Sequence, residues 1–283
     1  MLKTIAISGA VFFNALSASN PGCCGCSSDP TIWTYAGYNF GDYIGVTENY
    51  AEIGAFMVSG AETNEAVFID GRGYRFDNER WGASAGVGFR RLNACQDRAW
   101  GINAYYDYLE GRVNSFHDLS LGIESLGCAW DFRMNGYYHV GPNRRNTKET
   151  IFDEFTGNFI ASCKRVEFSY DHIDAEVGHT FCMRPFGATL YAAIGPYYYH
   201  SRLNDFFGGF ARIELNYNDI ISFQVRASHD DTFHTNVQGR VLVSIPFDTC
   251  LCWIQACRNL LSQPVRREGV MFTDNCCDWT WNW

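Results

Sequence analysis

From about residue 31 to residue 246, apolar and polar side chains alternate in runs of roughly ten residues, and a turn follows each run. In the run from Trp130 to His139, the apolar set Trp130, Phe132, Met134 and Tyr138 alternates with the polar set Asp131, Arg133, Asn135 and His139. A period of two is the side-chain period of a β-strand whose two faces meet different surroundings. The pattern therefore predicts an all-β fold built from long strands.

Twelve such runs can be placed along the chain. They lie at about 31–40, 50–60, 65–76, 81–91, 99–109, 116–127, 130–140, 170–182, 188–199, 207–217, 220–229 and 236–246. An even number of strands is what an outer-membrane barrel needs when both of its ends lie on the periplasmic side.

The lengths of the connections predict a direction for the strands. The connections after even-numbered strands are short: 61–64, 92–98, 128–129, 183–187 and 218–219. The longest connection, about 141–169, follows an odd-numbered strand and carries the charged stretch Arg144–Glu149, although the odd connection 77–80 is short. Since outer-membrane barrels have short periplasmic turns and longer extracellular loops, we expect the 141–169 connection to lie outside the cell.

Alternation alone does not distinguish a membrane barrel from a soluble β-sandwich, because both have one apolar and one polar face. The predicted strands are longer than the five or six residues typical of soluble sheets. Aromatic pairs such as Tyr105-Tyr106 and Tyr137-Tyr138 near strand ends resemble interfacial girdles. These features favour a twelve-stranded antiparallel transmembrane β-barrel over residues 31–247.

Composition and the first residues narrow the setting further. The 283 residues include 22 Lys and Arg against 31 Asp and Glu, a net charge of −9, and no basic stripe, so we expect no nucleic-acid partner. Residues 1–19 carry Lys3, the apolar stretch Thr4–Phe13 and a small-residue zone, which is typical of a signal peptide. The alternative is a buried N-terminal helix or strand. Residues 20–30 form a Cys-rich N-terminal segment.

Several stretches resemble one family when they are taken in order. Gly71–Asn78 followed by Trp81–Arg90 resembles an early hairpin of the intimin/invasin-type inverse autotransporter β-domain. The resemblance continues through Trp100–Asp107, Leu121–Leu126, Phe132–Tyr137 and Ile173–Gly178, and ends with Gln263–Val270. It covers roughly residues 50 to 272. Each motif is weak by itself, and their order and spacing carry the match.

The resemblance implies a twelve-stranded barrel with a helix in the pore after the last strand. The local sequence allows such a helix within residues 248–283, because Asp248 or Thr249 can cap it and Leu251, Ile254, Leu260 and Leu261 recur at helical spacing. The helix could instead pack under the barrel on the periplasmic side. A plug makes physical sense, since an unfilled twelve-stranded barrel should leak.

The chain departs from the family in one respect. It runs only to Trp283, about ten residues past the resemblance, so we expect no adhesin passenger. The aromatic, Cys-containing tail ends in Asp278–Trp283. This end is interpreted as an assembly signal, a short strand at the membrane interface or an unstructured tail.

Twelve cysteines are many for a barrel. In an exported protein they predict disulfides, and the candidates are Cys23, Cys24, Cys26, Cys95, Cys128, Cys182, Cys250, Cys252, Cys257, Cys276 and Cys277. Adjacent pairs such as Cys276-Cys277 cannot easily bridge within themselves. Disulfides to other envelope proteins and purely internal disulfides both stay open. Zinc binding at Cys23-Cys24-Gly25-Cys26 lacks a matching second pair.

The chain offers little for catalysis. His229-Asp230-Asp231 lies at an outer strand end, where an acid/base pair could activate water, but sequence neighbours in a strand point to different faces. We therefore predict no enzyme and no catalytic, cofactor-binding or metal-binding residues. Charged residues expected to face the lumen are Arg133, Glu176, Arg212, Glu214, Arg226 and Arg240.

The sequence thus predicts a bacterial outer-membrane barrel that is plugged and has a structural or surface role. The expected partners are outer-membrane lipid, the outer-membrane assembly machinery and envelope proteins linked through disulfides. A diffusion porin is the alternative function. A soluble β-sandwich and an outer-membrane hydrolase are the weaker alternatives.

Overall fold

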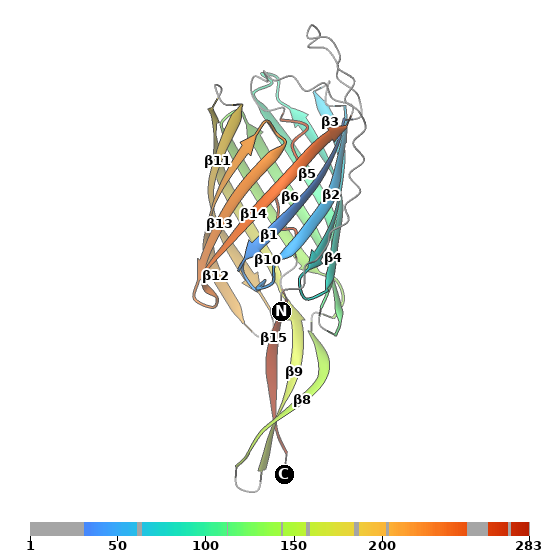
Figure 1. Ribbon diagram of the computed structural model, residues 1–283, viewed down its shortest axis with the longest axis vertical. Coiled ribbons are helices and arrows are strands. Elements are labelled where there is room, and N and C mark those ends of the chain that lie inside the picture. Colours follow the sequence, from blue (N-terminus) through green and yellow to red (C-terminus); the bar gives the residue numbers. More distant parts are fainter. Residues whose placement is uncertain are drawn as a thin grey trace, which may run out of the picture.

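A computed structural model describes the chain over most of its length (Figure 1). The described residues are 31–60, 64–111, 113–142, 144–156, 159–183, 187–201, 204–247, 260–270 and 273–282. The predicted signal peptide and the Cys-rich segment 20–30 lie outside them.

Twelve antiparallel strands form a closed barrel. They are β1 (Thr31–Gly41), β2 (Tyr50–Ser59), β3 (Glu65–Phe76), β4 (Trp81–Leu92), β5 (Arg98–Glu110), β6 (Ser115–Gly127), β7 (Trp130–His139), β10 (Asp171–Met183), β11 (Ala188–His200), β12 (Asp205–Tyr217), β13 (Ile221–Asp230) and β14 (His234–Phe247). Each wall strand pairs with the next wall strand along the chain, β7 with β10, and β1 closes the barrel on β14, with Ile32 opposite Phe247 and Gly41 opposite Gln238. The twelve-stranded barrel predicted from alternation is confirmed, within two residues at every strand end.

The barrel has two unlike ends. One end carries the tight connections after β2, β4, β6, β10 and β12, and we call it the turn end. The other carries the connections after β1, β3, β5, β7, β11 and β13, and we call it the loop end. At the turn end, for example, β6 passes to β7 between Gly127 and Trp130.

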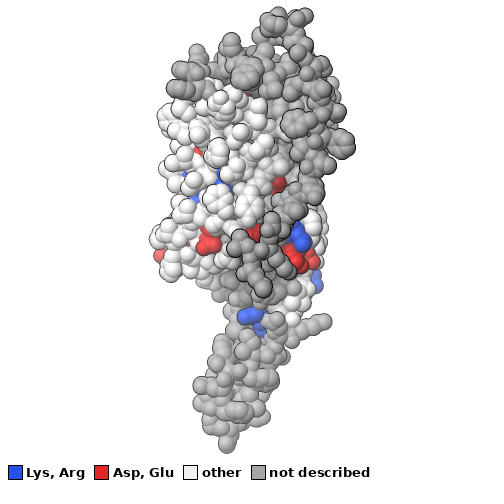
Figure 2. Space-filling model, viewed as in Figure 1, with Lys and Arg blue, Asp and Glu red and all other residues white. Residues whose placement is uncertain are grey.

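The two faces of the wall explain why the alternation is so regular. Outward side chains are apolar and exposed, and Leu121 reaches 71% exposure, whereas inward charged side chains such as Asp70 and Arg90 are completely buried. A soluble protein distributes these residues the other way round. Figure 2 shows that the visible outer wall is largely uncharged, with charged side chains gathered mainly toward the loop end. The outer face is therefore suited to lipid.

The long connection between β7 and β10 differs from our expectation of a loop. It forms a hairpin of β8 (Arg144–Thr156) and β9 (Phe159–Ser169), which stands out from the loop end (Figure 1). In the barrel wall β7 pairs directly with β10, with Tyr137 opposite His172, so the hairpin is an addition to a closed barrel. We call β8 and β9 the outer hairpin.

The C-terminal tail also forms a strand, β15 (Thr273–Asn282), which pairs with β9. The order β15-β9-β8 makes a three-stranded sheet beyond the barrel (Figure 1). Over the described part, the tail is thus a strand of this sheet and not a membrane-interface strand or an unstructured end.

The predicted pore helix falls mostly on residues 248–259, which lie outside the described residues. Leu260 and Leu261, expected at the end of that helix, have no helical conformation, and residues 260–270 follow an irregular path. No helix in the part of the chain that the structure describes is long and apolar enough to cross a membrane.

Among the residues that the structure describes, three clusters of apolar side chains are buried. The turn-end cluster includes Phe56, Phe68 and Leu126. At the loop end, one cluster is built around Tyr43, Tyr170 and Tyr199, and the other around Tyr50, Phe76 and Phe116. Apolar packing therefore fills both ends of the lumen, with a polar layer between them.

Candidate functional site

The most distinctive site is the lumen itself, because the chain passes through its own barrel. We call residues 260–270 the lumen segment. At the turn end Leu260, Leu261 and Val265 are buried in the turn-end apolar cluster. At the other end of the segment Val270 packs against the loop-end cluster around Tyr50 and Phe116. The segment therefore runs the length of the lumen, from the turn end to the loop end.

Two wall arginines hold the backbone of the lumen segment near the turn end. The guanidinium of Arg90 donates hydrogen bonds to the carbonyl oxygens of Leu261, at 2.9 Å, and Gln263. That of Arg72 donates to the carbonyl of Val265 at 2.8 Å. Because an irregular segment leaves its backbone carbonyls without partners, these arginines supply bonds that the barrel wall's own sheet cannot.

Each of these arginines is itself fixed by a buried carboxylate. Arg90 pairs with Glu124 at 2.6 Å, and Arg72 pairs with Asp70 at 2.6 Å. The hydroxyls of Tyr35 and Tyr105 also donate to Asp70, at 2.7 and 2.9 Å. A buried charge is stable only when it is paired and hydrogen-bonded, and this part of the lumen meets that condition.

Midway along the lumen, two adjacent arginines of the segment reach different walls. Arg266 donates two hydrogen bonds to the carboxylate of Glu214 on β12, at 3.0 and 3.1 Å. Arg267 donates to Asp107 on β5 at 2.8 Å and to Ser120 on β6 at 2.8 Å. In the closed strand order β12 and β5 lie on nearly opposite sides of the barrel, so the pair braces the segment across the lumen.

Aromatic rings complete the two arginine contacts. The guanidinium of Arg266 lies 4.3 Å from the ring centre of Tyr191, and that of Arg267 lies 4.3 Å from the ring centre of Tyr105. Cation–π contacts of this kind are stronger where water is excluded. The arginines are therefore held by charge and by packing together.

Near the loop end, Glu268 is the next contact of the segment. Its carboxylate pairs with Arg226 of β13 and accepts a hydrogen bond from the hydroxyl of Tyr43 at 2.9 Å. Its backbone N–H donates to the hydroxyl of Tyr137 at 2.8 Å. Burial raises the pKa of Tyr43 well above its ordinary value, so this hydroxyl stays protonated and can donate. The β1–β2 connection that carries Tyr43 is thus tied into the mouth of the lumen.

The structure places all six lumen candidates from the sequence in this polar layer. Arg133 and Arg212 both pair with Glu176, at 3.1 and 2.5 Å. Arg240 pairs with Glu52 at 2.8 Å. The other two contact the lumen segment, Glu214 through Arg266 and Arg226 through Glu268.

Sequence reasoning missed the partners that matter most for the segment. Arg72, Arg90 and Asp107 are not among the predicted lumen residues, although each lies at an inward position of an alternating run. Alternation could have identified them as inward, because every second residue of a wall strand faces the lumen. The contacts of Arg266, Arg267 and Glu268 had no local signal beyond the family resemblance.

Little free space remains beside the segment where the arginines gather. An internal cavity lined by Asp174, Glu176, Arg226, Arg267 and Glu268, among others, leaves about 10 Å³ open to the centre of a water molecule. That is room for about one water. This cavity beside Arg267 and Glu268 is therefore too small for a solute larger than water.

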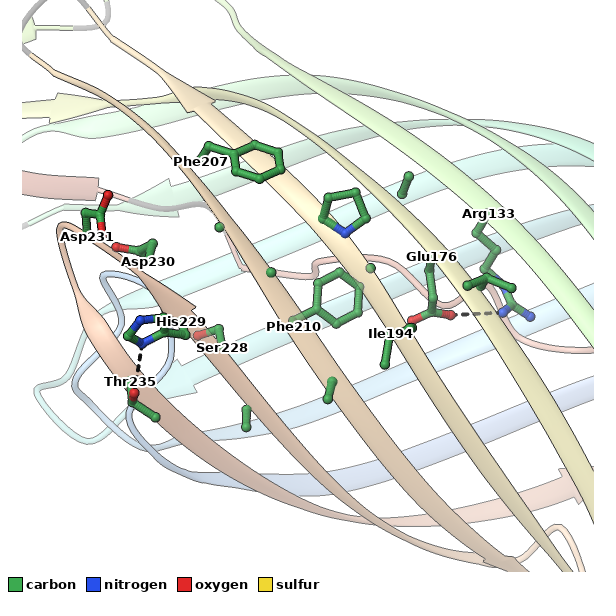
Figure 3. Close-up of a pocket in the computed structure, with 18 of the residues that line it drawn as sticks. Arg133, Glu176, Ile194, Phe207, Phe210, Ser228, His229, Asp230, Asp231 and Thr235 are labelled. Carbon is green, nitrogen blue, oxygen red and sulfur yellow. Dashed lines mark hydrogen bonds and ion pairs between the residues drawn. The ribbon is translucent and has the colours of Figure 1, made fainter.

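A larger hollow of about 990 Å³ is lined by residues of β7 and of β10 to β14, among them Glu176, Phe207 and Phe210 (Figure 3). His229, Asp230 and Asp231 line its loop-end edge. His229 Nδ1 lies 2.9 Å from the hydroxyl of Thr235, while buried Asp230 accepts a hydrogen bond from Tyr197 at 2.7 Å. His229 and Asp230 thus use different partners on different faces of the strand.

Three of the disulfide candidates have described side chains. Cys95, Cys128 and Cys182 are exposed free thiols at the turn end. For Cys276 and Cys277 the structure gives positions in β15 only, opposite Val166 and Arg165 of β9. Cys23, Cys24, Cys26, Cys250, Cys252 and Cys257 lie outside the described residues. Within the described part of the chain, no three His, Cys, Asp or Glu residues gather as metal ligands.

No known family profile matches the sequence. No curated protein matches it either. Solved structures do match the fold: a membrane protein studied for its in-meso crystallization shares 14% identity at a TM-score of 0.57, covering 86% of this chain and all of that one. An outer membrane channel from Pseudomonas putida F1 has 9% identity and a TM-score of 0.45, covering 81% of this chain and all of that one. The translocator domain of the autotransporter NalP from Neisseria meningitidis has 10% identity and a TM-score of 0.36, covering 76% and 88%.

The fold and the lumen indicate the same cellular location. A closed antiparallel barrel with an even number of strands, an apolar exposed outer wall and a charged interior is the architecture of outer-membrane proteins. The chain is therefore a β-barrel of the bacterial outer membrane.

Proposed function

We propose that this protein is a plugged outer-membrane barrel of the inverse-autotransporter kind. Its turn end faces the periplasm, its loop end faces outward, and the lumen segment carries the chain from one side to the other. The segment both closes the pore and presents β15 beside the outer hairpin. The role is structural and surface-directed, and it uses no catalytic chemistry and no cofactor.

One observation carries this proposal above the others: Arg266 and Arg267 are ion-paired to β12 and β5 on nearly opposite sides of the lumen. A segment that merely happened to fill a channel would not need matched carboxylates on both walls. Removing one partner of a buried pair leaves an uncompensated charge, so the segment and the wall depend on each other. A diffusion porin, the alternative function, has no use for such an arrangement.

The proposal is tested by planar-bilayer conductance of the refolded full chain. We expect the parent to conduct poorly and the Arg266→Ala/Arg267→Ala variant to show larger or flickering currents, because Glu214 and Asp107 lose their partners. Truncation after Phe247 removes the segment and should open the pore further. Arg75→Ala/Arg91→Ala removes the same charge from sites outside the lumen and serves as the control, which should conduct like the parent.

Two outcomes would contradict the plug. A large steady conductance in the parent would indicate a porin, in which the lumen segment does not close the pore. Equal conductance in the parent and the truncated chain would show that the segment contributes nothing to closure.

We also propose that the turn-end thiols form disulfides in the cell, with partners either inside this chain or on other envelope proteins. Cys95, Cys128 and Cys182 are exposed at one rim, and disulfides persist in the oxidising periplasm. Non-reducing gels of intact envelopes test the link to other proteins. Bands that contain only monomer would rule that link out and leave internal disulfides.

A further inference from the structure

The outer hairpin is fixed at its root. The carboxylate of Glu167, which is buried, accepts hydrogen bonds from the backbone N–H of Asn114 at 3.2 Å and from its side-chain amide at 3.1 Å. The next aromatic residues, Phe168 and Tyr170, are buried in the loop-end apolar cluster with Tyr43 and Tyr199. The root of β9 is therefore part of the rim of the barrel.

The lumen segment leaves the barrel beside this root. Val270 packs against the cluster that contains Phe116, and Phe116 lies on β6 two residues after Asn114, the residue that holds Glu167. Only residues 271 and 272 separate Val270 from β15, and the first pair of the β15–β9 ladder, Thr273 opposite Ser169, lies at the root. The chain that emerges from the lumen thus meets β9 at once.

β9 matches β15 more regularly than it matches β8. The β15–β9 ladder runs without a register shift from Thr273 opposite Ser169 to Asn282 opposite Ile160. The β8–β9 ladder has irregularities between Asn146 and Thr150 and between Phe152 and Glu154. The hairpin's own pairing is the interrupted one, and the uninterrupted edge is the one that takes the C-terminal segment.

We propose that the outer hairpin is a built-in strand acceptor, in which β9 captures the segment that emerges from the lumen by adding it as a third strand. This is strand addition to an open sheet edge, with main-chain hydrogen bonds as the source of affinity, and the occupant is residues 273–282 of the same chain. It rests on the proposed function, because it requires the segment to reach the loop end through the lumen. Pairing of residues 273–282 with β9 attaches the C-terminal part of the chain at a second place, independent of the ion pairs of Arg266 and Arg267.

Because β15 is an edge strand, proline substitutions on its paired side can be compared with proline substitutions on its solvent side as a test of strand capture. Successive residues of an edge strand point their N–H groups alternately toward the neighbouring strand and toward solvent. Proline removes the N–H, which is costly on the paired side and tolerated on the solvent side. Asp274→Pro/Asp278→Pro and Asn275→Pro/Trp279→Pro therefore alter opposite sides of the same strand with the same number of prolines.

The measurement is the rate at which protease added to intact cells releases an epitope tag placed after Trp283. We expect slow release from the parent and from one proline pair, and release about tenfold faster or more from the other pair, since an unpaired strand is open to cleavage. A chain in which a short turn replaces residues 142–168 should release the tag as fast as the sensitive pair. Its barrel can still close, because β7 pairs directly with β10.

The outcomes separate this proposal from the one it rests on. Equal release rates in both proline pairs, or no faster release after removal of the hairpin, would overturn strand capture while leaving the plugged barrel intact. A tag that protease reaches only after the outer membrane is permeabilised, in the parent as well as in the variants, would overturn the passage of the segment to the outside.

Discussion

Two neighbouring arginines show how position in the wall decides what a residue contributes. Arg90 faces the lumen and is completely buried, whereas the side chain of Arg91 faces outward and is 69% exposed. Arg90 pairs with Glu124 and donates to the carbonyl oxygens of the lumen segment. Arg91 has one loose ion pair, with Glu65 at 3.4 Å. An arginine therefore holds the lumen segment at position 90 and makes only an exposed ion pair at position 91.

We predict that Arg90→Ala destabilises the folded barrel by about 3–5 kcal/mol, because Glu124 is left charged and unpaired in a buried site. Arg91→Ala should cost less than about 1 kcal/mol, as for other exposed ion pairs. Equilibrium unfolding in urea, with the protein in the same detergent or lipid, measures both. Losses of similar size in the two variants would contradict the assignment of Arg90 to the lumen contacts.

For a single wall residue, the sequence predicts which face of the wall its side chain lies on, but not which residues that side chain contacts. Alternation identifies which side of the wall Arg90 faces, since its neighbours Phe89 and Arg91 occupy the other side. It contains nothing about Gln263, whose carbonyl Arg90 contacts across 173 residues of sequence. Contacts of the lumen segment depend on where an irregular stretch settles inside a closed barrel, and no local periodicity records that.

At the scale of the strands, several inward glycines make room for aromatic rings of the neighbouring strand. A Cβ on Gly86 of β4 would lie 2.2 Å from the ring of Tyr105 on β5, and one on Gly88 would lie 2.1 Å from the ring of Phe68 on β3. A ring laid over a glycine restores the packing that the glycine lacks. The hydroxyl of Tyr105 can thereby reach Asp70, beside Arg72.

We predict that Gly86→Ala destabilises the barrel by about 1–3 kcal/mol, the usual cost of an extra methyl group in a packed interior. Gly71→Ala is the matched control: Gly71 lies opposite Ala85 in the same hairpin, and a Cβ there would meet nothing within 4 Å. The control should be neutral or slightly stabilising, because alanine restricts the unfolded chain. Thermal or urea unfolding distinguishes the two, and a neutral Gly86→Ala would show that Tyr105 can move.

The strands that could be predicted from the sequence are those of the barrel wall, which have lipid on one face and the lumen on the other. A strand between an apolar and a polar environment must alternate, so all twelve wall strands can be identified from their period. The outer hairpin and β15 form a separate sheet beyond the barrel wall, so their sequences need not alternate between a lipid face and a lumen face. The 141–169 connection therefore reads as a charged loop in sequence, although β8 and β9 form most of it.

For the whole molecule, the ends of the barrel are as informative as the wall. The lumen segment enters among the apolar side chains of the turn end and leaves among those of the loop end, so both mouths are packed. The outer hairpin and β15 extend from the loop end alone (Figure 1). A barrel with two unlike ends has a defined orientation, and in the proposed function its turn end faces the periplasm, as the short connections there predict.

The exposed thiols make that orientation measurable. Cys95, Cys128 and Cys182 lie at the turn end, so we predict that a membrane-impermeant maleimide leaves all three unmodified in intact cells and modifies them once the outer membrane is permeabilised and disulfides are reduced. Asn78→Cys and Asp231→Cys, in connections of the loop end, should be labelled in intact cells without permeabilisation. Peptide mapping by mass spectrometry assigns each modification. If the native turn-end cysteines were labelled in intact cells and the two introduced cysteines were protected, the turn end would face outward. The lumen segment would then run in the opposite direction across the membrane.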